Sequence, residues 1–260
     1  MRFRPCIDIH NGKVKQIVGG SLRDEGDRAK TNFTAVQDAA WFARKYRGDH
    51  LKGGHIILLN PPASPYYEET RKQALLALRA FPGGMQIGGG ITDQNASGYL
   101  EAGASHVIVT SFVFQNGRLN RENLKKLCDA VGKERIVLDL SCRRRGGEYY
   151  IVTDRWQTFT EERLSETLLD ELAGHCSEFL VHGVDVEGKA SGVEEELVRL
   201  LGRWGKIPVT YAGWIGTLEE LEHFQNLCKG RLDFTIGSAL DLFGGNIPYE
   251  RAAQFHGKEL

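Results

Sequence analysis

The chain has 260 residues, of which 41% are hydrophobic and 26% charged, and its formal net charge is −1. These values are typical of a folded globular protein, and the near-zero charge argues against a large nucleic-acid-binding surface. The five cysteines are scattered without a C-x-x-C pair, which favours reduced thiols in a cytoplasmic protein over a disulfide framework or a zinc site. No apolar run approaches the roughly 18 residues of a membrane helix, and no secretory signal is evident.

Eight short apolar runs recur along the chain and have the composition of strands that are buried on both faces. In chain order they cover residues 5–9, 55–59, 85–88, 106–110, 135–140, 178–182, 207–211 and 233–237. Helical patterns lie between them, and alternation of this kind predicts a parallel sheet. At this length we expect one domain over residues 1–260, a closed (β/α)8 barrel, with an open doubly wound sheet as the alternative.

Capping residues and proline mark where these helices are expected to begin. The expected starts are Thr34 (with Gln37 three residues on), Ser64-Pro65 before 68–80, Asn120 before 122–131, Thr160 or Ser165 before a helix through Leu172, Val193 before a helix through Trp204, Thr217 with Glu220, and Pro248. Two long segments, 17–33 and 141–158, follow the first and fifth strands. Long loops on a compact scaffold are often functional lids.

The two halves of the chain repeat one another. Residues 6–9 (CIDI) resemble 137–140 (VLDL), residues 88–91 (GGGI) resemble 212–215 (AGWI), and residues 109–111 (VTS) resemble 236–238 (IGS). Three matches in the same order and at similar spacing indicate two similar half-barrels. Asp8 and Asp139 then occupy equivalent positions at the ends of the first and fifth strands, where barrels build their active sites.

An aspartate that ends an otherwise apolar strand is costly to bury unless it has a task. A single one could cap a loop or pair with an arginine, but two at equivalent positions favour catalysis. Two carboxylates that share a pocket can act as general acid and general base. Asp8 and Asp139 are therefore the candidate catalytic pair.

The glycines that follow the strands predict two sites for phosphate. Gly89 and Gly90 let the backbone approach an anion, Ser111 adds a hydroxyl, and a helix is expected to begin at Thr92 with its N-terminus toward that anion. The second half supplies the same elements with Gly213, Gly237 and Ser238. Two such cradles favour a ligand with two phosphates over a pair of tight turns.

Several further residues could serve the same pocket or simply pack. His182 ends the sixth strand and is a candidate substrate-binding residue, whereas His55 is expected to be a core histidine. Trp214 and Trp156 could stack on a flat heterocycle. The run 143–145 is three arginines, which form either a solvated surface or a phosphate-attracting loop. No metal-ligand spacing links the histidines.

The strand-end motifs resemble a known family, the phosphoribosylformimino-5-aminoimidazole carboxamide ribotide isomerases of histidine biosynthesis. The resemblance covers essentially the whole chain and rests on residues 6–14 (CIDIHNGKV), 86–91 (QIGGGI) and 236–239 (IGSA). It is nearest to the eukaryotic type through residues 109–111 (VTS), 137–143 (VLDLSCR), 156–158 (WQT) and 241–246 (DLFGGN).

The resemblance implies an Amadori rearrangement without a cofactor, in which the aminoaldose ProFAR becomes the aminoketose PRFAR. The substrate is a small ribotide with a phosphate at each end, matching the two cradles. Asp8 corresponds to the family's base, which removes the C2 proton. The acid that opens the ribose ring is left open among Asp139, Glu187 and Asp185, because the sixth strand lacks the bacterial Thr-x-x-x-x-Asp-Gly pattern.

The chain departs from bacterial members elsewhere as well. Leu58 and Asn60 stand where two aspartates are usual, Thr92 where an arginine follows the glycines, and Gln16 where the first loop has another arginine. Two alternative functions remain: the ammonia-dependent cyclase that acts next in the same pathway, and a barrel that only senses a phosphorylated metabolite. The expected partner is the substrate alone, with no nucleic acid, no membrane and a monomeric enzyme.

Overall fold

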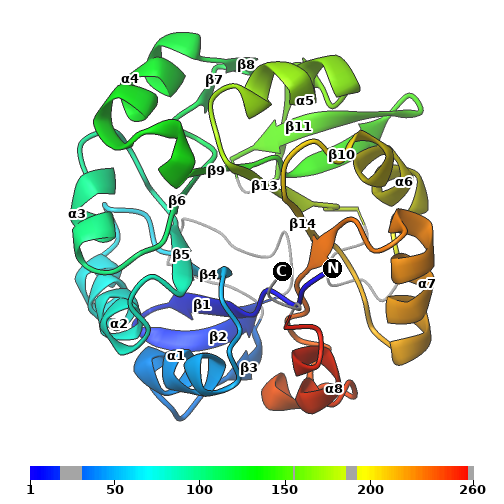
Figure 1. Ribbon diagram of the computed structural model, residues 1–260. Coiled ribbons are helices and arrows are strands. Elements are labelled where there is room, and N and C mark those ends of the chain that lie inside the picture. The colour runs from blue at the N-terminus through cyan, green and yellow to red at the C-terminus, as the bar shows by residue number, and fades with distance from the viewer. Residues whose placement is uncertain (18–30, 155, 186–191, 257–260) are drawn as a thin grey trace.

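The computed structural model describes residues 1–17, 31–154, 156–185 and 192–256 (Figure 1). Its framework is a ring of parallel strands paired in chain order. These are β1 (Cys6–His10), β4 (Gly54–Leu58), β5 (Met85–Gly88), β6 (Val107–Val109), β9 (Ile136–Asp139), β13 (Glu178–His182), β14 (Val209–Ala212) and β15 (Asp233–Phe234). Each of the eight predicted apolar runs overlaps one of these strands, although the last run, 233–237, extends three residues beyond β15.

Backbone hydrogen bonds across the first and last strands close the ring. The Arg4 N–H donates to the Phe234 carbonyl at 2.8 Å, and the Phe234 N–H donates to the Arg2 carbonyl at 3.0 Å. Phe3 and Phe234 thereby form a parallel bridge between the two ends of the sheet. The closed barrel is confirmed, and the open doubly wound alternative is wrong.

Helices surround the ring on its outside (Figure 1). They are α1 (Ala39–Gly48), α2 (Tyr67–Ala80), α3 (Ala96–Glu101), α4 (Arg121–Val131), α5 (Glu166–Ala173), α6 (Glu195–Trp204), α7 (Leu218–Cys228) and α8 (Tyr249–Ala253), with short 3-10 turns at Lys133–Arg135 and Asp241–Phe243. The predicted caps Asn120, Ser165 and Thr217 are confirmed, since each side chain accepts a backbone N–H of the first turn. No helix in the described ranges is long and apolar enough to cross a membrane.

Three predicted helix starts are wrong. Thr34 lies in strand β3, and the side chain of Asp38 caps α1 instead by accepting the Trp41 N–H at 2.8 Å. Ser64 accepts the Tyr66 N–H within a turn, and α2 begins only at Tyr67. The segment after the glycine triplet is a turn in which Asn95 accepts the Thr92 N–H, so α3 begins at Ala96 and not at Thr92.

The two long segments contain strands rather than loops alone. After β1, strands β2 (Lys13–Ile17) and β3 (Thr31–Thr34) extend the sheet in antiparallel pairing, with the part between them outside the described residues. After β9, a three-stranded sheet forms from β10 (Cys142–Arg145), β11 (Glu148–Thr153) and β12 (Thr158–Arg163). Its first turn is Gly146-Gly147, with φ of 62° and 88°, the backbone signature of a type I′ hairpin. A smaller hairpin joins β7 (Phe114–Gln115) and β8 (Arg118–Leu119).

Strand alternation sorts the side chains of the ring between the outer core and the barrel interior. Along β13, for example, Glu178, Leu180 and His182 all face inward. The middle layer of the interior is apolar and consists of Ile57, Ile108, Val137, Leu180 and Ala212. That layer lies between the polar groups at one end of the barrel and those at the other.

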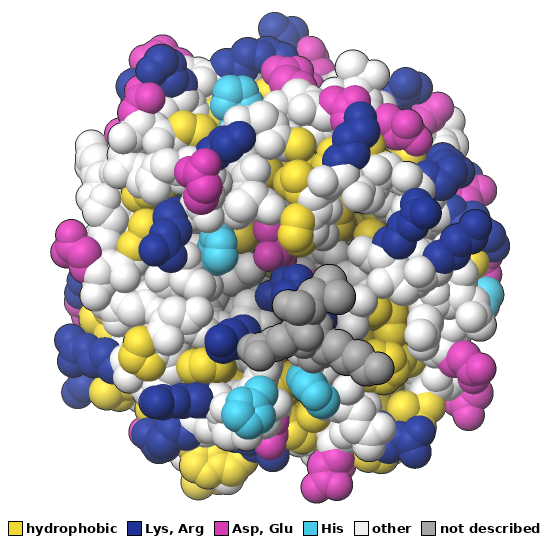
Figure 2. Space-filling model, in the orientation of Figure 1, with side chains coloured by type: hydrophobic (Ala, Val, Ile, Leu, Met, Phe, Trp, Pro, Cys, Tyr) yellow, Lys and Arg dark blue, Asp and Glu magenta, His cyan; other side chains and the backbone are white. Residues whose placement is uncertain are grey.

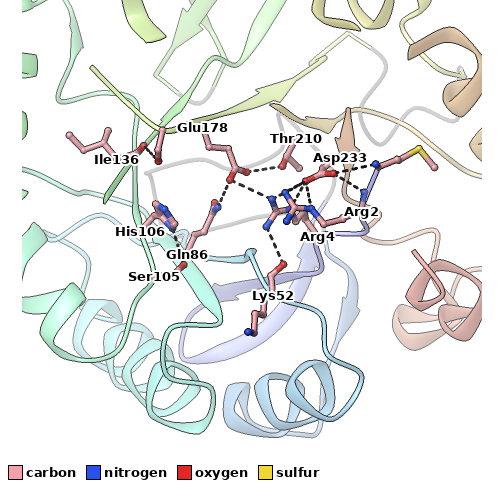
Figure 3. A network of polar contacts seen from close by, with 12 residues as sticks. Arg2, Arg4, Lys52, Gln86, Ser105, His106, Ile136, Glu178, Thr210 and Asp233 are labelled. Atoms are coloured by element: carbon pink, nitrogen blue, oxygen red, sulfur yellow. Dashed lines mark hydrogen bonds and ion pairs between the residues drawn. The ribbon is translucent and has the colours of Figure 1, made fainter. Parts of the chain in front are cut away.

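A buried polar network lies at the N-terminal ends of the strands (Figure 3). The guanidinium of Arg4 contacts Asp233 at 2.8 Å and Glu178 at 3.7 Å. Glu178 also accepts hydrogen bonds from Gln86 at 3.0 Å and Thr210 at 2.8 Å. Charged residues deep in a barrel require such partners, so this network stabilises the fold. On the molecular surface, basic and acidic side chains interleave over the face shown in Figure 2, in keeping with the small net charge.

Candidate active site

A cavity of about 260 Å³ opens at the C-terminal ends of the barrel strands. This is the end at which (β/α)8 enzymes assemble their active sites from the loops that follow the strands. Of the residues predicted from the sequence, its lining includes Asp8, Asp139, His182, Gly213, Trp214, Gly237 and Ser238. Cys6, Gln16 and His55 line the same cavity, so the structure adds polar groups that the motifs do not indicate.

Asp8 lies in β1, half-buried, with its carboxylate in the cavity. Burial raises the pKa of Asp8 to about 6, and the attraction of His182 together with a hydrogen bond from Gln16 limits the rise. The bond joins Gln16 Nε2 to Asp8 Oδ2 at 3.4 Å, and the same amide lies 3.6 Å from the Cys6 sulfur. A carboxylate with a pKa near the working pH is suited to accept a proton and to return it.

Gln16→Leu is expected to shift the acid limb of the activity profile to higher pH. The substitution removes the donor that favours the ionised form of Asp8, so the pKa of Asp8 rises further. A base works only when ionised; activity is therefore lost as pH falls through that pKa, and the variant loses it sooner. A hydrogen bond to a charged group limits the shift to about one pH unit. The measurement is kcat/KM against pH, and an acid limb at the wild-type position would contradict this role of Gln16.

Asp139 ends β9 inside a set of hydrogen-bond donors. The Ser141 hydroxyl donates to Asp139 Oδ1 at 2.9 Å, and His182 Nδ1 lies 3.1 Å from the same oxygen. Burial by itself raises the pKa of Asp139, but the attraction of His182 and the hydrogen bonds from His182, Ser141 and Thr110 outweigh it and lower the pKa. Asp139 is therefore ionised at neutral pH, in contrast to the raised pKa of Asp8.

Trp156 supports this set of donors from the segment between β11 and β12. Its indole N–H donates to the Ser141 hydroxyl at 3.0 Å, and its ring lies 5.8 Å from the imidazole of His182. The tryptophan thereby holds Ser141, which in turn holds Asp139. The sequence singled out Trp156 for stacking on a ligand, whereas the structure gives it a supporting contact as well.

His55 lines the same cavity from β4, and its pKa is lowered by its surroundings. Burial lowers the pKa of His55 to about 3, with repulsion from His182 adding to the effect and attraction to Asp139 opposing it. His55 is therefore neutral across the physiological range. It can accept or donate a hydrogen bond there, but it carries no charge.

Of the other two candidates for the acid, the structure describes only Asp185. Glu187 falls outside the described residues. Asp185 receives a hydrogen bond from Arg143 Nε at 3.0 Å and another from the Arg144 backbone N–H at 2.8 Å. Because Asp185 pairs with the hairpin and is not part of the cavity lining, the structure does not bring it to the site.

The arginine run on β10 is likewise engaged with protein groups. Arg143 pairs with Asp185 and Arg144 with Glu196 at 2.6 Å. The guanidinium of Arg145 lies over the rings of Tyr150 and Phe159, at 4.3 Å and 4.8 Å from their centroids. These contacts favour a structural role on the hairpin over the phosphate-attracting role.

The glycine-rich strand ends have the close backbone approaches that a cradle requires. Gly89 has φ of 102°, and a Cβ there would collide with the Leu58 carbonyl. A Cβ on Gly237 would collide with the side-chain oxygen of Gln16. Gly237 belongs to the cavity lining, whereas Gly90 and Ser111 lie exposed beyond it, at the ends of neighbouring strands. The second predicted cradle is thus inside the cavity and the first lies outside its lining.

A closed barrel with two carboxylates and an imidazole gathered at the C-terminal ends of its strands has the arrangement of a (β/α)8 enzyme active site. The family described as "Histidine biosynthesis protein" matches residues 2–247. The chain belongs to this family.

Relatives from plants and fungi resemble the chain over nearly its full length. A protein of Medicago truncatula is 51% identical, covering 100% of this chain and 83% of its own length. One from Neurospora crassa is 47% identical, covering 94% and 93%, and one from Saccharomyces cerevisiae is 38% identical, covering 99% of each chain. Each is named as an isomerase of an imidazole-4-carboxamide that carries two phosphoribosyl groups, and the Medicago protein is named as chloroplastic.

Proposed function

We propose that this protein isomerises ProFAR to PRFAR, the Amadori rearrangement of histidine biosynthesis. The observation that carries the proposal is that one cavity holds both Asp8, whose pKa is raised to about 6, and the ionised Asp139 in contact with His182. The names of the relatives support the same reaction.

The reaction needs an acid to open the ribose ring and a base to take the C2 proton. Asp8 is the proposed base, because its pKa of about 6 leaves it ionised at pH 7 yet basic enough to accept a proton. The acid that opens the ring is proposed to come from the Asp139–His182 pair, or from Glu187 as the sequence also allows. All of these steps are proton transfers, for which the reaction needs no cofactor.

The substrate's two phosphates are proposed to bind the two glycine-rich cradles. Gly213, Gly237 and Ser238 line the cavity and would hold one phosphate through backbone N–H groups and a hydroxyl, with Trp214 beside them. Gly89, Gly90 and Ser111 would hold the other at the neighbouring strand ends. A substrate that reaches both cradles lies across the strand ends, with its sugar carbons over Asp8 and Asp139.

We further propose that the enzyme is a monomeric single-domain barrel over residues 1–260 that works in the cytoplasm. All five cysteines are free thiols, as expected for a reducing compartment. No nucleic-acid or membrane partner is needed for the proposed reaction.

Turnover of the purified protein tests the function directly. With ProFAR and no ammonia, we expect the aminoketose PRFAR to accumulate. Cyclisation that appears only when ammonia is supplied would identify the cyclase instead. Binding of ProFAR without any conversion, measured by calorimetry, would identify a metabolite sensor.

A further inference from the structure

We infer that His182 is the general acid that opens the substrate ring, and that Asp139 is the carboxylate that orients His182 and keeps it charged. The inference rests on the proposed isomerisation and settles on one residue for the acid, which the sequence leaves open among Asp139, Asp185 and Glu187.

Asp139 itself is poorly placed to donate a proton. Its Oδ1 already accepts from Ser141 at 2.9 Å and contacts His182 Nδ1 at 3.1 Å, and Thr110 adds another donor. Donors of this kind favour the carboxylate form, and the pKa of Asp139 is lowered accordingly. A group that is ionised at neutral pH has no proton to give to a ring oxygen.

His182 has both the position and the partner that a general acid needs. It ends β13 on the cavity wall, with 13% of its side chain exposed. A carboxylate beside one imidazole nitrogen stabilises the protonated ring and fixes the Nδ1 proton toward itself. The remaining ring nitrogen, Nε2, is then the one that can transfer a proton to a substrate, as in other paired histidine–carboxylate sites.

The charged groups around the imidazole support this state. Among the described residues, the ionised Asp139 faces His182 from β9, and Asp8 interacts with it from β1. His55 on β4 is neutral because its pKa is lowered to about 3, so it does not force His182 to lose its proton. Trp156 and Ser141 complete the surroundings as uncharged supports.

His182 and Asp8 together carry out every proton transfer of the proposed reaction. The His182 imidazolium protonates the ring oxygen as the bond from C1 to that oxygen breaks, and the amine nitrogen's electron pair forms a C1=N bond. Asp8 removes the C2 proton, whose bonding electrons form C1=C2 as the C1=N electrons return to nitrogen. The C2 hydroxyl then gives its proton to His182 as C2=O forms, and Asp8 returns its proton to C1. Both residues end as they began, and the aminoketose is released.

The test compares His182→Gln with the matched variant His55→Gln by measuring kcat/KM against pH. His182→Gln should lose about 10²- to 10⁴-fold in kcat/KM, and its residual activity should lack the alkaline limb. His55→Gln removes a neutral imidazole from the same cavity, so its alkaline limb should persist. ProFAR affinity and thermal melting, measured for both variants, establish that each is folded, and His182→Asn serves if His182→Gln is not.

Asp139→Asn separates the two members of the pair. If Asp139 only supports the imidazolium, the variant should move the alkaline limb to lower pH without abolishing it. An alkaline limb that survives in His182→Gln and vanishes in Asp139→Asn would overturn the inference and make Asp139 the acid. Failure of the proposed function would look different, because wild-type protein would then convert no ProFAR at any pH.

Discussion

Asp8→Asn is expected to lower kcat/KM for ProFAR by about 10²- to 10⁴-fold, the usual contribution of a general base. Asparagine keeps the size of aspartate and can still bond to Gln16, so folding and substrate affinity should be retained. The amide cannot accept the C2 proton. A direct measurement is loss of deuterium from C2 of labelled substrate, whether it is carried to C1 of the product or exchanged into water, and this loss should fall together with turnover.

Asp185→Asn is the matched control for this substitution. Asp185 is an aspartate near the same end of the barrel, but its carboxylate pairs with Arg143 outside the cavity lining. A partly exposed ion pair contributes about 0–1 kcal/mol, so this variant should stay folded and active. Wild-type turnover in Asp8→Asn, or equal losses in the two variants, would remove Asp8 from the base's role.

The fold could be predicted from the sequence because its strands are nearly continuous apolar runs. Parallel strands in a barrel are covered on both faces, and the run at 178–182 coincides with β13 for that reason. The start of a helix was less predictable where two nearby residues could each cap its first turn. Thr34 has the spacing of a capping residue, but pairing of β3 with β2 places it in a strand and leaves Asp38 as the cap.

The internal repeat was sufficient to find Asp8 and Asp139, because equivalent strand ends meet in one place in a barrel. It could not show how their environments differ. Asp139 accepts a hydrogen bond from Ser141, which in turn accepts one from Trp156 in the segment between β11 and β12. Asp8 accepts a hydrogen bond from Gln16 on β2 instead. The run RRRGGEYYIVT, with two glycines between alternating residues, was the available signal for the hairpin of β10 and β11.

Arg4→Met is expected to lower the free energy of unfolding strongly, although residues near a chain terminus usually contribute little to it. The guanidinium is 7% exposed and contacts Asp233 at 2.8 Å and Glu178 at 3.7 Å, while also donating to the Lys52 carbonyl at 3.1 Å. Methionine replaces the volume but removes a cation that contacts both buried carboxylates, Glu178 and Asp233. Removing one partner of a buried ion pair costs about 3–5 kcal/mol of unfolding free energy. Because Arg2 still bonds to Asp233, we expect a loss near the lower value.

Arg2→Met is the matched control, because Arg2 is an exposed cation that contacts the same carboxylate as the buried Arg4. Arg2 bonds to the same Asp233 carboxylate, but its side chain is 44% exposed, so its loss should cost about 0–1 kcal/mol. Urea unfolding of the two variants at one pH gives both free energies. The apolar layer around Leu180 separates this network from the cavity, so folded Arg4→Met should retain wild-type kcat/KM. Equal stability of the two variants would mean that the network contributes nothing beyond its surface charges.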